Sequence, residues 1–392
     1  MIPSRQSKKI FRRHPKIDPS TRRWLNKYPV LKGALTRAQK RFGDLPGVLG
    51  LGIGRKYHES KKKYGAAPIN TGGFCIKVLV ERKKATLPQK EKIPRSLRVT
   101  IPGEKASYQV LIDVVALARS GEKLGSHKKL QEGRGWPTAG VVTPGRLFAF
   151  GRGTTDEYGM GFTKSQQVRL GTTGVVIKTR VGDYYAVSAG HVFAEPCQKD
   201  TDRPKGLRAV GVKDRSFIPV EGDEFFPSSI EDGGVISDVI GYRVPSSVLP
   251  EEFSWPDGFT RELATQDDIE RAILEEGKRT AFVWVERGEI DRPQAIPVDL
   301  ELKLTGFKDY VNCESGSVDL EYGTSWGLLY TSKEKTMGGD SGAAVFVIAE
   351  DGFHCRLLGF HFLMSGGRSY AMDAKTFLEA NFKNPQRELV FP

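Results

Sequence analysis

Residues 336–346 read TMGGDSGAAVF and place Ser341 in a glycine-rich turn directly before an apolar segment. Glycine adopts backbone conformations that other residues avoid, so a turn of this kind can expose a serine hydroxyl. The same turn can direct the backbone N–H groups of Gly339 and Ser341 toward one point, which is the arrangement of an oxyanion hole. The segment therefore predicts a nucleophilic serine immediately ahead of a strand.

A second segment, YYAVSAGHVF at residues 184–193, supplies the base that such a serine needs. His191 ends an apolar strand-like run at a corner of small residues, which lets its imidazole face outward. A serine hydroxyl is a weak nucleophile alone, and a histidine can accept its proton near neutral pH. Together the two segments predict acyl transfer, with His191 as general base and Ser341 as nucleophile.

These segments resemble a known family. VSAGHV and GGDSGAAV are similar to the histidine and serine motifs of trypsin-like serine peptidases, and they occur in that family's order. The resemblance covers roughly residues 147–392. It implies two perpendicular β-barrels with the active site between them, and an oxyanion hole formed by Gly339 and Ser341. Residues 357–362, LLGFHF, resemble the strand that pairs with the substrate backbone, which implies substrate-binding roles for Gly359 and His361.

The family also requires an acid that orients the histidine, and two alignments compete for it. Asp238, in VISDVIGYRV, opens an apolar strand 47 residues after His191 and is our prediction for the acid. In the rival alignment, the strand RTAFVWVE at residues 279–286 takes that place, with Thr280 where the acid should be. The other candidates for the acid are then Asp232, Asp267 and Asp268, and an incomplete triad stays open as well.

The chain has 392 residues, a length that suits two compact units. We expect a basic flexible tail at residues 1–23, a small α/β domain at 24–119, a linker at 120–145 and the peptidase domain at 146–392. The predicted fold class is mainly β: a double β-barrel preceded by the small α/β domain.

Periodicity supports this division. Residues 32–42 have helical spacing, and strand-like runs follow at 47–54, 74–82, 97–101 and 110–117. Short strand-like runs between glycine, aspartate and proline turns dominate the second half. Helices are expected at residues 266–276, with Thr265 as N-cap, and at 374–382.

The glycines of GLGIG, residues 50–54, do not predict a nucleotide site, since their spacing is not GxGxxG and a polar segment rather than a helix follows. The layout of GVLGLGIGRK and FCIKVLVERK ahead of the peptidase motifs also resembles plant narrow-leaf-type proteins and their bacterial relatives.

The formal net charge is +13, and more than half of it lies in residues 1–23, which hold eight basic residues and one acid. This tail could contact nucleic-acid phosphates or be solvated. The solvated interpretation is favoured because only Phe11 interleaves with the charges. The N-terminal module could recruit a partner protein or further copies of the chain.

Several classes of protein are not indicated. No apolar run approaches the roughly 20 residues of a membrane span, and no secretory signal is visible, so a cytoplasmic location is expected. The four cysteines show no CxxC pairing, and neither a metal nor a cofactor is predicted. Two hypotheses remain: a serine endopeptidase acting on proteins or peptides, and a degenerate peptidase fold that serves as a scaffold.

Overall fold

The computed structural model describes somewhat more than half of the 392 residues. The described residues are 28–58, 69–83, 88, 91–100, 107–116, 127–128, 147–151, 168–193, 208–211, 217–219, 225–226, 230–231, 235–244, 246, 258–274, 280–285, 294–305, 307–313, 316–330, 334–337, 340–349, 351–365, 368–381 and 387–390. The predicted tail lies outside this part of the chain, as does the predicted linker apart from residues 127–128.

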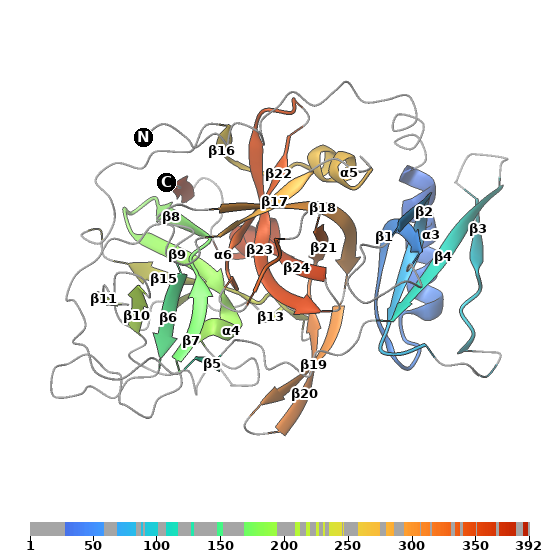
Figure 1. The fold of residues 1–392 in the computed structure, drawn as a ribbon, viewed down its shortest axis with the longest axis horizontal. Helices are drawn as coiled ribbons and strands as arrows, with labels where there is room; N and C mark the ends of the chain where they lie inside the picture. Colours follow the sequence, from blue (N-terminus) through green and yellow to red (C-terminus); the bar gives the residue numbers. More distant parts are fainter. Residues whose placement is uncertain are drawn as a thin grey trace.

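A closed β-barrel forms the centre of the molecule (Figure 1). Its strands follow the order β17-β22-β23-β24-β21-β18, and β17 also pairs with β18, which closes the ring of six. All six pairings are antiparallel. The predicted mainly β fold is confirmed. The six strands are β17 (Ala281–Val285), β18 (Gln294–Thr305), β21 (Ser325–Tyr330), β22 (Ala344–Ile348), β23 (Cys355–Ser365) and β24 (Arg368–Asp373).

Two further antiparallel sheets, of five strands each, lie at the left of Figure 1. One contains β12 (Phe225–Phe226), β15 (Val239–Val244), β9 (Tyr184–Ala189), β8 (Val175–Thr179) and β25 (Arg387–Val390). The other contains β11 (Phe217–Pro219), β10 (Arg208–Gly211), β6 (Leu147–Gly151), β7 (Val168–Thr172) and β5 (His127–Lys128). A smaller sheet joins β13 (Ile230–Glu231), β14 (Val235–Ile236), β20 (Gly316–Tyr322) and β19 (Phe307–Cys313).

Four helices accompany the sheets in the described part of the chain: α3 (Tyr28–Phe42), α4 (Gly190–Phe193), α5 (Gln266–Leu274) and α6 (Ala374–Asn381). The structure confirms the predicted helices that correspond to α3, α5 and α6. None of the helices in the described residues is long and apolar enough to cross a membrane.

The N-terminal module continues the sheet of the barrel. Its strands, in the order β1-β2-β4-β3, extend from β18 because β1 pairs with β18 at Leu51↔Thr305 and Ile53↔Lys303. Helix α3 packs on this sheet through its apolar stripe, whose residues belong to the hydrophobic core. The strands are β1 (Val48–His58), β2 (Ile69–Val80), β3 (Ser96–Thr100) and β4 (Ser107–Ala116). The predicted polar loop after residue 54 is partly wrong, because β1 runs on to His58 in register with Ile69.

Two hydrophobic clusters lie on opposite faces of the barrel strands. Alternate side chains of β22 belong to different clusters: Phe346 to the one shared with β9 and β15, and Val345 to the one shared with α3 and α5. Successive side chains of a strand point to opposite faces, so one strand can serve two cores. The barrel is therefore buried on both sides and connects the other two parts of the chain.

A buried ion pair crosses the junction between the module and the barrel. Lys77 on β2 pairs with Glu301 on β18, and the two side chains are 1% and 0% exposed. Strand β1 lies between them, and a Cβ at Gly54 would come within 3.0 Å of the Lys77 Cδ and 3.1 Å of the Glu301 carbonyl oxygen. Here the glycine leaves the space that the lysine stem occupies.

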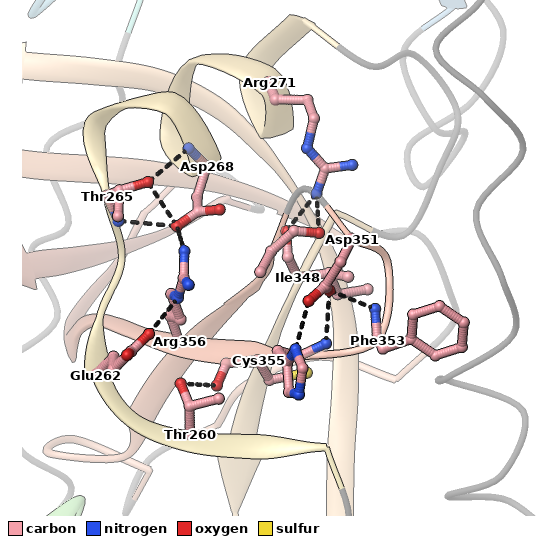
Figure 2. A network of polar contacts seen from close by, with 12 residues as sticks. Thr260, Glu262, Thr265, Asp268, Arg271, Ile348, Asp351, Phe353, Cys355 and Arg356 are labelled. Atoms are coloured by element: carbon pink, nitrogen blue, oxygen red, sulfur yellow. Dashed lines mark hydrogen bonds and ion pairs between the residues drawn. The ribbon is translucent and has the colours of Figure 1, made fainter.

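A polar network fixes α5 to the far end of the β22–β23 hairpin (Figure 2). The Thr265 hydroxyl accepts the Asp268 N–H at 3.1 Å, and the Asp268 carboxylate accepts the Thr265 N–H at 2.9 Å. This reciprocal cap confirms Thr265 as the N-cap of α5. Arg356 on β23 donates to Asp268 at 2.9 Å, and Arg271 donates to the Ile348 carbonyl at 2.6 Å.

Burial opposes ionisation of Asp268, but the hydrogen bonds from Arg356 and Thr265, together with the Arg356 charge, outweigh it and lower the pKa of this carboxyl. In the same hairpin, partial burial of Asp351 raises the pKa of its carboxyl. The backbone N–H groups of His354 and Phe353 and the His354 ring bind the carboxylate, outweigh this effect and lower the pKa to about 2. Both carboxylates therefore stabilise the fold in their ionised form.

We expect Lys77→Met to lower the free energy of unfolding by about 3–5 kcal/mol, because it leaves the Glu301 carboxylate buried without its partner. The double variant Lys77→Met/Glu301→Leu should recover most of that loss, since both charges are gone. Urea unfolding measures both, with Lys83→Met, an exposed position of the same segment, as control. Wild-type stability of the single variant would contradict the importance of this pair.

We expect Asp268→Asn to lower the free energy of unfolding at pH 7 by about 1–3 kcal/mol. The folded pKa of Asp268 lies below the unfolded value of about 4, so its contribution is complete above pH 4 and disappears as the pH falls through the folded pKa. The difference between wild type and variant should thus shrink on acidification. Urea unfolding at several pH values measures this difference. The control is Asp267→Asn, which changes the exposed neighbour of Asp268. A difference that does not change with pH would disprove this role.

Candidate active site

His191 stands in the short helix α4, directly after β9, and is 1% exposed. Strand β15 pairs antiparallel with β9, with Val239 opposite Ala189. The residue before β15 is Asp238, so the pairing brings it beside the start of α4. The Gly190 N–H donates to the Asp238 carbonyl at 3.2 Å and continues the ladder by one step. Strand register thus joins two residues that are 47 positions apart in the chain.

Asp238 contacts His191 through both carboxylate oxygens. Oδ1 accepts the backbone N–H of His191 at 2.7 Å, and Oδ2 lies 2.6 Å from the ring atom Nδ1. An ionised carboxylate can only accept hydrogen bonds, so Nδ1 carries the ring hydrogen. The other nitrogen, Nε2, is then an acceptor, and it lies 3.1 Å from the Ser341 hydroxyl oxygen. These distances are within the range for proton transfer between a base and a nucleophile.

The turn that carries Ser341 is hydrogen-bonded to β7 on one side and to β23 on the other. The Thr172 N–H, from β7, donates to the Ser341 carbonyl at 2.7 Å. On the other side, the Gly342 N–H donates to the His361 carbonyl of β23 at 2.7 Å. Ser341 is therefore held at the point where the sheet of β7 approaches the barrel strands β22 and β23.

The turn itself is closed by Asp340, which is 2% exposed. Its carboxylate accepts the Met337 N–H at 2.8 Å, and its own N–H donates to the Met337 carbonyl at 3.1 Å. The Ala343 N–H in turn donates to the Asp340 carbonyl at 2.9 Å. This aspartate therefore has a structural role in the turn.

Gly342 is the tightest position of the turn. Its φ is +95°, and a Cβ there would lie 2.2 Å from both the Ser188 hydroxyl and the Thr172 carbonyl oxygen. Ser188 is itself bound to Thr172 by a hydrogen bond of 2.8 Å. Gly174 is equally close to the turn, since a Cβ there would lie 2.4 Å from the Gly342 carbonyl oxygen.

Sequence reasoning missed these supporting residues. Thr172, Gly174 and Ser188 carry no chemical motif, and the only signal was the run of small residues at 171–174 and 188–190. Small residues there make room for the serine turn, which comes from a distant part of the chain.

The rival candidates for the acid fall elsewhere. Thr280 accepts the Leu300 N–H through its hydroxyl at 3.1 Å and belongs to the barrel. Asp268 is committed to the cap of α5, and Asp267 is exposed on the same helix. Asp232 lies outside the described residues, as does Gly339, so the geometry of the predicted oxyanion hole is not described.

Gly359 and His361 lie on β23, where the strand is paired on both sides. Gly359 is opposite Val345 on one side and Asp373 on the other. His361 uses its N–H for the Ala343 carbonyl at 2.8 Å and its carbonyl for Gly342. Backbone pairing with a substrate, implied by the resemblance, therefore does not fit these two residues. Gly359 has a structural reason instead, since a Cβ there would lie 2.1 Å from the Met372 carbonyl oxygen.

The described residues contain no group of three or more His, Cys, Asp or Glu side chains that could hold a metal ion.

No protein-family model matches the chain, and no curated protein matches it. Solved structures with a similar fold are proteases. The Nocardiopsis protease is 12% identical, with a TM-score of 0.31 over 64% of this chain and 97% of that protein. The serine protease of a human pathogenic astrovirus is 14% identical, with a TM-score of 0.29 over 61% and 95%. The tobacco etch virus protease is 11% identical, with a TM-score of 0.28 over 64% and 82%. At such values the similarity says nothing about the chemistry of this chain.

We expect Gly342→Ala to destabilise the protein more than Gly182→Ala. Both glycines have a positive φ, +95° and +93°, which costs an alanine about 1–2 kcal/mol. Only Gly342 would also place its Cβ against other atoms, whereas nothing lies within 4 Å of one at Gly182. The clash should add about 1–3 kcal/mol to the loss of unfolding free energy in Gly342→Ala. Urea unfolding of the two variants measures the difference, and equal losses would show that the turn is not tightly enclosed.

Proposed function

We propose that this protein is a serine endopeptidase, which hydrolyses peptide bonds in proteins or peptides through an acyl-enzyme intermediate. The observation that carries the proposal is the row of hydrogen bonds from Asp238 through the His191 ring to the Ser341 hydroxyl, at 2.6 and 3.1 Å. A nucleophile bonded to a base, which is bonded in turn to an orienting group, is the arrangement that activates a serine.

In the proposed mechanism, Ser341 Oγ attacks the peptide carbonyl carbon while its proton passes to His191 Nε2. The imidazolium is stabilised by Asp238, which remains ionised and keeps the ring in orientation. The N–H groups of Gly339 and Ser341 bind the oxyanion of the tetrahedral intermediate. His191 then protonates the leaving amine, and a water molecule, deprotonated by the same imidazole, hydrolyses the acyl-enzyme.

A cysteine nucleophile is less well supported. The two cysteines whose side chains are described, Cys75 and Cys355, are buried. Burial, together with the charge of Asp351, raises the pKa of the Cys355 thiol far above its ordinary value. The thiolate is the reactive form of cysteine, so this site does not favour it.

The edge of β23 beyond the serine turn suits a peptide substrate. Leu363, Met364 and Ser365 pair with β24 on one side, and no other strand in the described part of the chain pairs with them. Because the last bond on the β22 side joins Gly342 to His361, this open edge starts next to Ser341. An extended peptide that adds a strand there would bring its carbonyl groups toward the hydroxyl.

A fluorophosphonate probe should label the wild type at Ser341, and Ser341→Ala should abolish labelling. Turnover of a casein or peptide-library substrate should fall about 10⁶-fold in Ser341→Ala. It should fall about 10⁴-fold in Asp238→Asn, because the His191 ring loses the acceptor that fixes its hydrogen on Nδ1.

His354→Ala provides the control for His191→Ala. His354 also contacts an aspartate, Asp351, through its Nδ1 atom, but it is exposed and lies between β22 and β23. Removing it should leave labelling unchanged, while His191→Ala should nearly eliminate it. Folded wild-type protein that is not labelled and hydrolyses nothing would reject the endopeptidase and favour the scaffold hypothesis.

A further inference from the structure

Positive charge is concentrated at one end of the chain. Residues 1–42 contain thirteen lysines and arginines and one acid, whereas residues 43–392 contain forty-seven basic and forty-six acidic residues. Nearly all of the net charge of +13 therefore belongs to the segment that ends with α3. The proposed peptidase activity makes no use of it.

Helix α3 displays part of this charge on its solvent-exposed half. Lys32, Arg37, Lys40 and Arg41 are exposed, and the helix contains no acidic residue. At 100° per residue, Lys32, Lys40, Arg37 and Arg41 fall at about 0°, 80°, 140° and 180° around the helix axis. They are therefore spread over the solvent-exposed half of the helix, which we call the basic face. The opposite side, with Ala34 among its buried residues, packs on the sheet and fixes the orientation of this face.

Several contacts hold the basic face in place. The Arg37 guanidinium donates to the Arg98 carbonyl of β3 at 2.8 Å, and the Arg41 guanidinium lies 5.4 Å from the centre of the Phe42 ring. The Thr36 hydroxyl donates to the Lys32 carbonyl at 3.2 Å. The Arg37 and Arg41 side chains are thus positioned by the fold before any partner binds.

The composition of the basic face favours nucleic acid over a protein partner. Protein interfaces depend on apolar or aromatic anchors that become buried. The exposed large hydrophobic residues of the described part of the chain are Leu111, Val181, Met337 and Phe353, and none of them belongs to α3. Interfaces with nucleic acid are instead polar and strongly positive.

The dimensions suit duplex DNA. From Lys32 to Arg41 the helix rises about 13 Å, a distance over which one strand of DNA presents roughly four phosphates. A helix also fits the major groove of B-form DNA, whereas the major groove of an RNA duplex is too narrow. Single strands are bound largely by stacking on aromatic residues, and the basic face exposes none at its four positions.

We propose that the basic face of α3 binds duplex DNA through its phosphate backbone. In Figure 1, α3 lies at the right of the molecule, whereas α4, which carries His191, lies to the left of the barrel. Bound DNA would therefore leave Ser341 uncovered. This role does not depend on the proposed peptidase activity and would persist in Ser341→Ala.

The test is fluorescence anisotropy of the full chain with a labelled 24-base-pair DNA of mixed sequence, over a series of NaCl concentrations. The variant Lys32→Gln/Lys40→Gln/Arg41→Gln removes three charges of the basic face. The control Arg180→Gln/Arg261→Gln/Lys375→Gln removes three exposed charges from other elements. Thermal unfolding checks that both variants are folded.

We expect the first variant to bind at least about tenfold more weakly at 50 mM NaCl, and its plot of log K against log [NaCl] to be shallower by about 2–3, since each phosphate contact contributes about 0.9. The control should stay within about twofold of wild type, because phosphate contacts are local. Equal losses in both variants, an unchanged slope in the first, or no binding by the wild type would overturn the proposal.

Competitors distinguish the kind of partner. Unlabelled duplex DNA should displace the probe better than single-stranded DNA, duplex RNA or poly-glutamate at equal charge concentration. Poly-glutamate that competes as well as DNA would instead identify an acidic protein as the partner. Duplex RNA or single-stranded DNA that competes better would reject the assignment to duplex DNA.

Discussion

The structure of the site depends on one backbone constraint: the turn at Ser341 must fit between two parts of the molecule. The bond from Thr172 to the Ser341 carbonyl ties it to one side, and the bond from Gly342 to His361 ties it to the other. The two sides approach so closely that a Cβ at position 342 would have no room, and this is why the residue there is a glycine. Because both bonds are made by backbone atoms, the position of the hydroxyl does not depend on flexible side chains.

The histidine and the aspartate are positioned by a different device, the register between β9 and β15. Antiparallel pairing of Ala189 with Val239 brings the end of one strand to the start of the other. Asp238 then satisfies the first turn of α4 and the imidazole at once, through its two oxygens. A shift of one residue in this register would turn Asp238 to the opposite face of its sheet, so the alignment of the strands and the chemistry of the site are coupled.

The barrel links this site to the rest of the chain by continuous pairing. Strand β18 closes the barrel against β17 and at the same time extends it into the N-terminal module through β1. Lys77 and Glu301 cross that junction, and the network of Arg356 and Asp268 fixes the far end of β23 to α5. Buried or partly buried charges thus mark both places where separate elements join the barrel. Their desolvation is compensated only in the correct arrangement.

The amino-acid sequence by itself determined the local features: the strands that flank His191 and Ser341, and the helix capped by Thr265. These follow from the periodicity of side chains and from turn chemistry, which act over a few residues. The contact of Asp238 with His191, the close packing at Gly174 and Ser188, and the place of Lys77 were decided only by the tertiary structure. Each depends on strands that pair across tens to hundreds of residues, and no local pattern encodes which distant strand becomes the neighbour.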